Sequence, residues 1–129
     1  MFKVKPMLHN QLQAVIFDVD GTLAETERDG HRVAFNHAFA EFGIDWHWTP
    51  EEYGRLLGVA GGKERLRRYA ACHAPQLLHQ RSFPDLIARV YRRKSEIYSC
   101  IALGGSIPLR PGVRRLITEL RTAGIRLAI

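Results

Sequence analysis

Apolar residues form two short runs near the ends of the chain, and helical stripes lie between them. Ala14–Phe17 is the first run and is closed by aspartate and glycine residues; Ile125–Ile129 is the second. Apolar runs rich in β-branched and aromatic residues and bounded by turn residues are typical of buried strands. We therefore predict a buried, parallel first strand and a second apolar strand. Because a core of two strands is incomplete, the second strand is expected to expose an unpaired edge and an apolar face.

The segment between the two runs has helical periodicity. Helices are expected over residues 25–42, from Thr49 to Gly58, over 63–72, from Ser82 to Gly104 and from Val113 to Gly124. The second of them opens with Thr49, Pro50 and Glu52, the pattern of a capping box with proline in the first turn. Cys72 and Cys100 have no motif spacing and are expected to be reduced, packed thiols.

The number of helices decides the domain organisation. A simple crossover between parallel strands needs one helix, and here four precede the last one. We predict an α/β fold with a partial Rossmann-like core of parallel strands, interrupted by a helical insertion. The core is assigned to residues 13–25 and 109–129, the insertion to 26–108 and an N-terminal tail to 1–12.

The segment Asp18-Val19-Asp20-Gly21-Thr22 carries the most informative chemistry. A buried strand delivers two carboxylates past its C-terminal end, where ligands bind in open α/β sheets. Two unpaired carboxylates at one buried spot repel, and a hard divalent cation such as Mg²⁺ relieves that repulsion. A carboxylate is also a nucleophile for phosphoryl transfer, and a second one can act as general acid and base. The alternative is a strand that ends in a solvated turn.

This segment resembles the first motif of the haloacid-dehalogenase-superfamily phosphatases. The likeness extends to the CbbY-type phosphatases through four stretches and covers residues 13–129. They are 17–27, His31 with Ala34-Phe35-Asn36 after it, 61–65 and 109–112. The resemblance identifies the helical insertion as the cap domain of that superfamily.

The resemblance also implies roles for the two aspartates. Asp18 would be the nucleophile that forms an aspartyl-phosphate, and Asp20 the general acid and base. The Asp18 carboxylate and the Asp20 backbone carbonyl would bind Mg²⁺. Dehalogenases of the superfamily lack an acid at the second position, so Asp20 indicates phosphoryl transfer. The implied substrate is a sugar phosphate, with xylulose 1,5-bisphosphate as the leading candidate.

Five further residues are candidates for substrate binding. By resemblance, Glu27 and His31 begin the cap and face the site, and the cap segment with Gly62, Lys63 and Arg65 contacts substrate. Backbone amides at a helix start and a lysine suit an anion, and an arginine can clamp a second phosphate. The alternatives are a solvent-facing histidine, a helix–helix turn at the glycines and a solvated arginine.

The net charge of +6 is unevenly distributed along the chain. Residues 109–129 hold five arginines and one glutamate, spaced along one predicted helix. A solvated helix face is the simplest interpretation, and the same holds for the runs 67–68 and 92–94. We therefore expect no nucleic-acid partner. No apolar run approaches the roughly 18 residues of a membrane helix and no secretory signal is visible, so a cytoplasmic location without membrane contact is expected. The full-length protein is expected to be a monomer.

Several parts of the superfamily site have no counterpart in this sequence. The expected serine or threonine after the second strand, a later lysine and a downstream acidic pair are all missing. The sequence therefore looks like the N-terminal portion of a phosphatase, and we expect little or no turnover from it alone. A phosphoglucomutase of the same superfamily, a non-catalytic binding fragment and a nucleic-acid-binding protein are the alternatives.

Overall fold

The computed structural model describes residues 12–129 and is mostly helical, with two parallel strands. Its elements in chain order are β1 (Ala14–Ile16), a π-helical turn η1 (Thr26–His31), α1 (Arg32–Glu41), α2 (Pro50–Leu56), α3 (Gly62–His73), a 3₁₀ turn η2 (Pro75–His79), α4 (Phe83–Leu103), α5 (Val113–Thr122) and β2 (Arg126–Ala128). All the predicted helices are present, and the first begins as the π-helical turn. Of the predicted tail, residues 1–11 lie outside the described residues.

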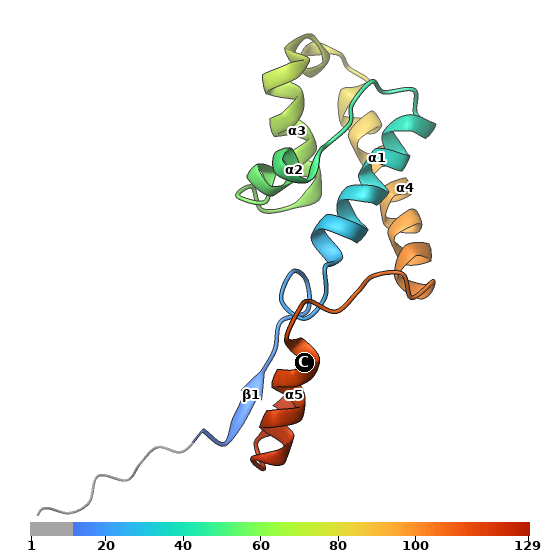
Figure 1. The fold of residues 1–129 in the computed structure, drawn as a ribbon. Coiled ribbons are helices and arrows are strands. Elements are labelled where there is room, and N and C mark those ends of the chain that lie inside the picture. Colours follow the sequence, from blue (N-terminus) through green and yellow to red (C-terminus); the bar gives the residue numbers. More distant parts are fainter. Residues whose placement is uncertain (1–11) are drawn as a thin grey trace, which may run out of the picture.

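The two strands form a parallel pair, as predicted. Val15 lies opposite Leu127, and the Phe17 amide donates to the carbonyl oxygen of Ala128 at 2.9 Å. Helix α5 precedes β2 and contacts it (Figure 1). Gly112 directly precedes α5 and has φ = +84°, a backbone conformation that glycine adopts without steric cost. The strand–helix–strand core therefore brings the end of β1 next to the end of β2.

Helices α1 to α4 form a separate body around one aromatic core (Figure 1). Helix α1 lies along α4, and α3 contacts α4 as well. Phe35, Phe39, Trp48 and Tyr53 are at most 1% exposed, with ring centroids 4.8 to 6.3 Å apart in the contacting pairs. Burial of rings of this size dominates the stability of a small helical core.

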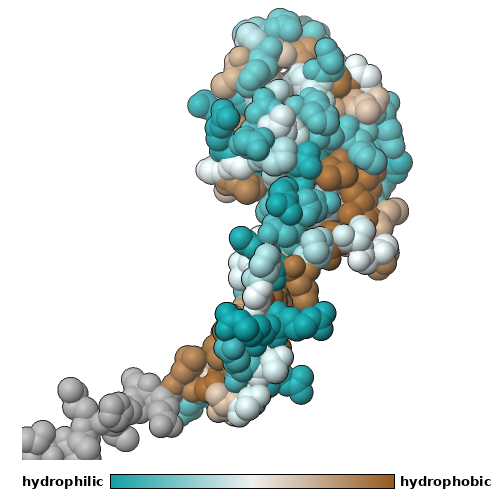
Figure 2. Space-filling model, in the orientation of Figure 1, coloured by the Kyte–Doolittle hydropathy of each residue, from teal (hydrophilic) through white to brown (hydrophobic). Residues whose placement is uncertain are grey.

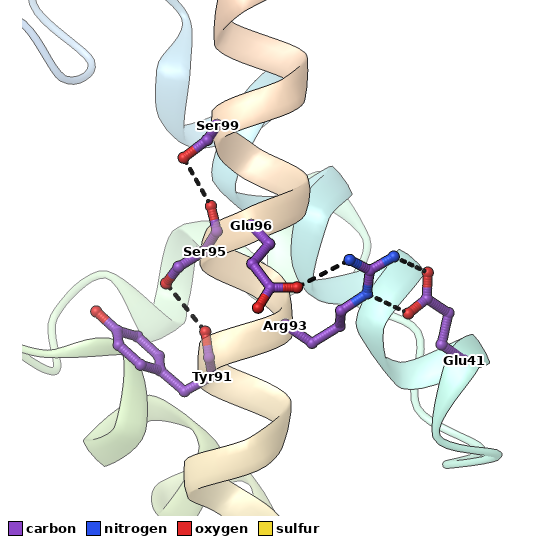
Figure 3. A network of polar contacts seen from close by, with 6 residues as sticks. All are labelled: Glu41, Tyr91, Arg93, Ser95, Glu96 and Ser99. Carbon is purple, nitrogen blue, oxygen red and sulfur yellow. Dashed lines mark hydrogen bonds and ion pairs between the residues drawn. The ribbon is translucent and has the colours of Figure 1, made fainter.

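A polar network on the surface also joins α1 to α4 (Figure 3). The Arg93 guanidinium donates to both carboxylate oxygens of Glu41, at 2.6 and 3.0 Å, and to Glu96 at 2.9 Å. The hydroxyl groups of Ser95 and Ser99 donate to backbone carbonyls one turn earlier on α4. Because exposed ion pairs contribute little to stability, we expect this network to add little to the stability that the aromatic core provides.

Two chain segments connect the helical body to the strands, and they run side by side (Figure 1). The Glu25 amide donates to the Pro108 carbonyl at 3.1 Å, and the Arg110 amide donates to the Leu23 carbonyl at 3.0 Å. Ala24 and Leu109 form an antiparallel bridge between these segments. Backbone hydrogen bonds thus join the two connecting segments at the point where the chain passes from strands to helices.

The prediction of a buried strand is wrong for the first strand, because Ile16 is 81% exposed. Ile129, after the second strand, is 84% exposed, and hydrophobic surface gathers at this end of the molecule (Figure 2). A groove of about 470 Å³ runs along the strands and α5 and is lined by Phe17, Leu23 and Ile117 among others. A sheet of two strands packed against one helix leaves its other apolar side uncovered.

The cysteines differ from expectation in one respect. Cys72 and Cys100 are free, as predicted, but both are exposed rather than packed. Cys72 lies at the end of α3 and Cys100 near the end of α4, on the outward sides of these helices. Within residues 12–129, no helix is long and apolar enough to span a bilayer.

Candidate active site

The loop after β1 carries Asp18 and Asp20 and turns tightly around one carbonyl group. The Val19 carbonyl oxygen accepts hydrogen bonds from the amides of residues 22–24 at 3.0 to 3.2 Å. The Thr22 hydroxyl donates to Asp18 Oδ2 at 3.1 Å. Both aspartate side chains remain exposed to solvent. The loop is therefore rigid in its backbone and open at its carboxylates.

Gly21 and Arg110 secure the other side of this loop. Gly21 has φ = +69°, and its amide donates to the hydroxyl of the buried Thr26 at 3.2 Å. The Arg110 guanidinium donates to the Gly21 carbonyl oxygen and pairs with Glu25 through Nε at 3.2 Å. Arg110 therefore holds the residue next to Asp20 from a position 89 residues later in the chain.

A pocket of about 480 Å³ lies between this loop and the helical body. It is lined by Asp20, Gly21, Glu25, Glu27, Arg28, Pro50, Tyr53, Gly54, Leu57, Arg65 and Arg110. Three of the predicted site residues, Asp20, Glu27 and Arg65, therefore meet in one cavity. Its volume falls in the range of pockets that hold small molecules.

Asp20, His31 and Lys94 form a row of polar side chains that leads from the β1 loop into the helical body. His31 Nε2 lies 4.0 Å from Asp20 Oδ1, and Lys94 Nζ lies 2.9 Å from His31 Nδ1. A charged lysine only donates, so Nδ1 accepts and the histidine proton is assigned to Nε2, which faces Asp20. The His31 ring also stacks on Tyr98, with centroids 3.8 Å apart. The π-helical turn η1 and helix α4 thus orient the same imidazole from two sides.

Lys94 is held in a cage of aromatic rings. Its Nζ lies 4.8 Å from the ring centroid of Phe35, 5.4 Å from that of Tyr98 and 5.7 Å from that of Tyr91. The side chain is only 6% exposed. Burial lowers the pKa of Lys94 from its ordinary 10.5 to about 8, with the charge of Arg65 acting in the same direction and those of Glu27 and Asp20 opposing it. Burial, and next the charge of Lys94, lower the pKa of His31.

Glu27 and Arg65 meet through a buried tyrosine. The Tyr53 hydroxyl donates to Glu27 Oε2 at 2.8 Å, and Arg65 donates to the Tyr53 hydroxyl oxygen at 3.3 Å. Arg65 Nε also donates to the Val59 carbonyl at 2.9 Å, which fixes its guanidinium. Burial, followed by the neighbouring Glu27, raises the pKa of Tyr53 well above its usual range. Tyr53 therefore stays a hydrogen-bond donor at any physiological pH.

The remaining predicted residues lie outside this pocket. Asp18 is on the same loop but does not line the cavity. Lys63 is exposed, with Nζ 5.5 Å from the ring centroid of Tyr91. A Cβ atom at Gly62 would collide with the Tyr91 ring and lie 3.2 Å from Phe35. Gly62 therefore permits the close approach of α3 to α4, a packing role that spacing alone did not suggest.

The interpretation of residues 92–94 as a solvated run is wrong for Lys94. Positions 87, 90, 91, 94 and 98 follow helical spacing, so Lys94 lies in the apolar stripe of α4. The helical spacing of Lys94 from these apolar residues was therefore a signal in the sequence that could have predicted its burial. Tyr53 and Arg110 also went unrecognised as parts of the site, since their partners are far away in the chain.

Comparison with known proteins identifies the family. The sequence profile of the haloacid dehalogenase-like hydrolases matches residues 12–129. The chain belongs to this family. It is 48% identical over 120 residues to protein CbbY of Cereibacter sphaeroides. That alignment covers 92% of this chain and 49% of the relative. It is 50% identical over 118 residues to the plasmid protein CbbY of Cupriavidus necator, covering 92% of this chain and 46% of that protein.

A solved structure of this haloacid dehalogenase-like family supports the fold. The crystal structure of CbbY from Rhodobacter sphaeroides in complex with phosphate matches with a TM-score of 0.64 and 48% identity, over 90% of this chain and 49% of that chain. A mutant of the same protein was crystallised with xylulose 1,5-bisphosphate and matches with 47% identity and the same TM-score. The present chain spans about half the length of the relatives it matches.

The donors on the β1 loop fit a hard cation only in part. Asp18 and Asp20 offer oxygen ligands at the end of a strand, and both are exposed to solvent. Mg²⁺ takes one or two carboxylates and fills its other positions with water and phosphate oxygens. In the described part of the chain, no three His, Cys, Asp or Glu side chains gather around one point. The loop can therefore contribute one side of a magnesium site.

The lowered pKa of Lys94 predicts a pH dependence of stability. Between pH 8 and 10.5 the unfolded chain holds the Lys94 proton more tightly than the folded one, so the free energy of unfolding should rise with pH in this window. At 1.36 kcal/mol per pKa unit, the gain amounts to about 3 kcal/mol. Lys94→Met should remove this rise. Urea unfolding of both proteins at pH 7.5 and pH 10.5 measures it.

Arg92→Met is the matched control for this experiment, because Arg92 is the exposed neighbour of Lys94 on α4. The control should keep the full rise between the two pH values. Equal pH dependence in the wild type and in Lys94→Met would show that the lysine is not held in a desolvating cage.

Proposed function

We propose that the full-length protein is a Mg²⁺-dependent phosphatase that acts on a sugar bisphosphate of the xylulose 1,5-bisphosphate type. The proposal rests on the position of Asp20. Its carboxylate lines a pocket together with Glu27 and Arg65, and it faces the His31 Nε2 proton. Family membership and the ligands named for the CbbY structures add support. Residues 26–108 would be the cap over a core formed in part by 13–25 and 109–129.

The reaction would run through an aspartyl-phosphate. An Asp18 carboxylate oxygen attacks the phosphorus atom, and the bond from phosphorus to the sugar oxygen breaks. Asp20 in its acid form gives its proton to that sugar oxygen, and then, as a carboxylate, takes a proton from the water that attacks the phosphoenzyme. Inorganic phosphate leaves and Asp18 is free again. Mg²⁺ held by Asp18 and the Asp20 carbonyl would supply charge neutralisation for the phosphoryl group.

The surrounding residues would position these groups. His31, itself fixed by Lys94 and Tyr98, can donate its Nε2 proton toward Asp20 and so direct that carboxyl group. Glu27 retains one oxygen for a sugar hydroxyl, since the other accepts from Tyr53. Arg65 offers a fixed positive charge for a second phosphate. His31, Lys63 and Gly62 are not part of the pocket lining, so the proposed contacts within the pocket rest on Glu27 and Arg65, and His31 would act through Asp20.

The assay combines the full-length protein, Mg²⁺ and a panel of sugar bisphosphates, followed by phosphorus NMR. One free phosphate released per sugar converted, abolished by EDTA, is the expected result. An isomerised sugar phosphate without net phosphate release would instead identify a mutase. Tight sugar-phosphate binding without turnover would identify a binding protein, and either result overturns the proposal.

A further inference from the structure

A second pocket, of about 440 Å³, lies on the outer side of α2 and α3. From α3 it is lined by Arg68, Tyr69, Cys72 and His73, whose spacing places them on one face of the helix. Arg55 lines it from α2. This volume lies within the range of small-molecule sites.

Helix α2 separates this pocket from the candidate active site. Pro50, Tyr53 and Gly54 face the active-site pocket, whereas Glu52 and Arg55 face the second one. Both sets follow helical spacing, so they occupy two different sides of one short helix. The second pocket is therefore a distinct cavity, and nothing in the proposed reaction uses it.

The charges of the second pocket favour an anion. Among the described residues, neither Arg55 nor Arg68 has a carboxylate within 4.0 Å of its guanidinium. Glu52 is the one acid in the lining, and its Oε2 accepts from the Thr49 amide in the capping box, so two guanidinium groups against one carboxylate leave the lining positive. Two guanidinium groups without close carboxylate partners over an apolar floor that includes Leu56 are well suited to a phosphate or carboxylate group.

The pocket also presents a flat ring surface. His73 stacks on Tyr69, with ring centroids 4.1 Å apart and an angle of 16° between the planes. The His73 Nδ1 proton is donated to the Tyr69 carbonyl oxygen at 3.1 Å, which fixes the imidazole plane. His73 is exposed, so its outer face is free to stack against a planar ligand.

We infer that this pocket binds a planar aromatic anion of the nucleoside monophosphate class, with the phosphate at Arg55 and Arg68 and the ring against His73. The two features needed for such a ligand, a pair of guanidinium groups and a stacking surface, lie within one cavity. The inference is independent of the proposed phosphatase activity. A failure of one leaves the other standing, because the readout below involves no turnover.

Cys72 provides a probe within the pocket, and Cys100 provides the internal control. Both thiols are exposed, but Cys72 lines the second pocket and Cys100 lies on α4 outside it. The full-length protein is alkylated with iodoacetamide, and each cysteine peptide is followed by mass spectrometry. AMP at about ten times its dissociation constant should slow Cys72 alkylation about tenfold, since the ligand-free fraction falls by that factor. Cys100 should react at an unchanged rate.

Partial ligands and variants decide which features are recognised. Adenosine lacks the anion and ribose 5-phosphate lacks the ring, so each should need at least about tenfold higher concentration to protect Cys72. Arg55→Gln with Arg68→Gln should abolish protection by AMP. Arg67→Gln should keep it, because Arg67 pairs with Glu64 outside the pocket.

Three results would overturn the inference. The first is a Cys72 rate unaffected by millimolar AMP. The second is AMP protection that persists in the double arginine variant. The third is protection by adenosine or by ribose 5-phosphate equal to that by AMP at the same concentration. It would mean that binding does not require both the ring and the anion.

Discussion

Replacing Asp18 with Asn in the full-length protein is expected to reduce phosphate release by at least about 10⁴-fold, because an amide is no nucleophile toward phosphorus. In the proposed mechanism Asp20→Asn removes only proton transfer, which is expected to cost about 10²- to 10⁴-fold. The two variants should differ in kind as well. With an aryl phosphate, whose leaving group needs no proton, Asp20→Asn should form the phosphoenzyme and Asp18→Asn should not.

Intact-mass measurement after rapid quenching detects the phosphoenzyme directly. The Asp20→Asn protein should gain the mass of one phosphoryl group, since the water that cleaves the intermediate lacks its base. Asp85→Asn is the control and should keep full turnover, because this exposed acid pairs with Arg89 on α4 and neither residue lines the pocket. Full turnover by Asp18→Asn, or a phosphoryl group found on that variant, would refute the assignment of the nucleophile.

The local parts of this structure were readable from the sequence. The capping box at Thr49 and Glu52 forms as predicted, with both reciprocal hydrogen bonds. The helices also follow the predicted order. Such features depend on residues within four positions of each other, so periodicity and turn chemistry determine them. The pairing of β1 with β2 joins distant segments, and its prediction rested on the order of strands and helices along the chain.

The parts that were missed depend on contacts between distant segments. Lys94 looked solvated because it follows two arginines, yet it is enclosed by rings from α1 and α4. The Glu27–Tyr53 bond spans 26 residues, and Arg110 reaches Gly21 across 89. Periodicity places a residue on a face of its own helix, but it does not show which side chains of another element pack against that face. Motif reasoning singled out Asp20 and Glu27, which line the pocket, whereas their contacts with His31 and Tyr53 could be seen only in the fold.

Phe35 contacts both the aromatic core and Lys94, and Phe35→Ala should strongly destabilise the helical body. Its ring is fully buried and contacts the rings of Phe39, Trp48 and Tyr53. Loss of a buried phenylalanine costs about 3 to 5 kcal/mol, through lost burial and through the cavity left behind. Urea unfolding followed by tryptophan fluorescence measures it, and His37→Ala on the exposed side of α1 should change little.

The same substitution should act on the site through Lys94, whose Nζ lies over the Phe35 ring. Opening the cage admits water beside the ammonium group, so the pKa of Lys94 should rise toward its ordinary value and the rise of stability above pH 8 should shrink. Phe35→Leu fills most of the volume without a ring, so it should keep more of the stability than Phe35→Ala and also retain burial of Lys94. A Phe35→Ala protein that is destabilised yet keeps the wild-type pH dependence would show that the cage does not depend on this ring.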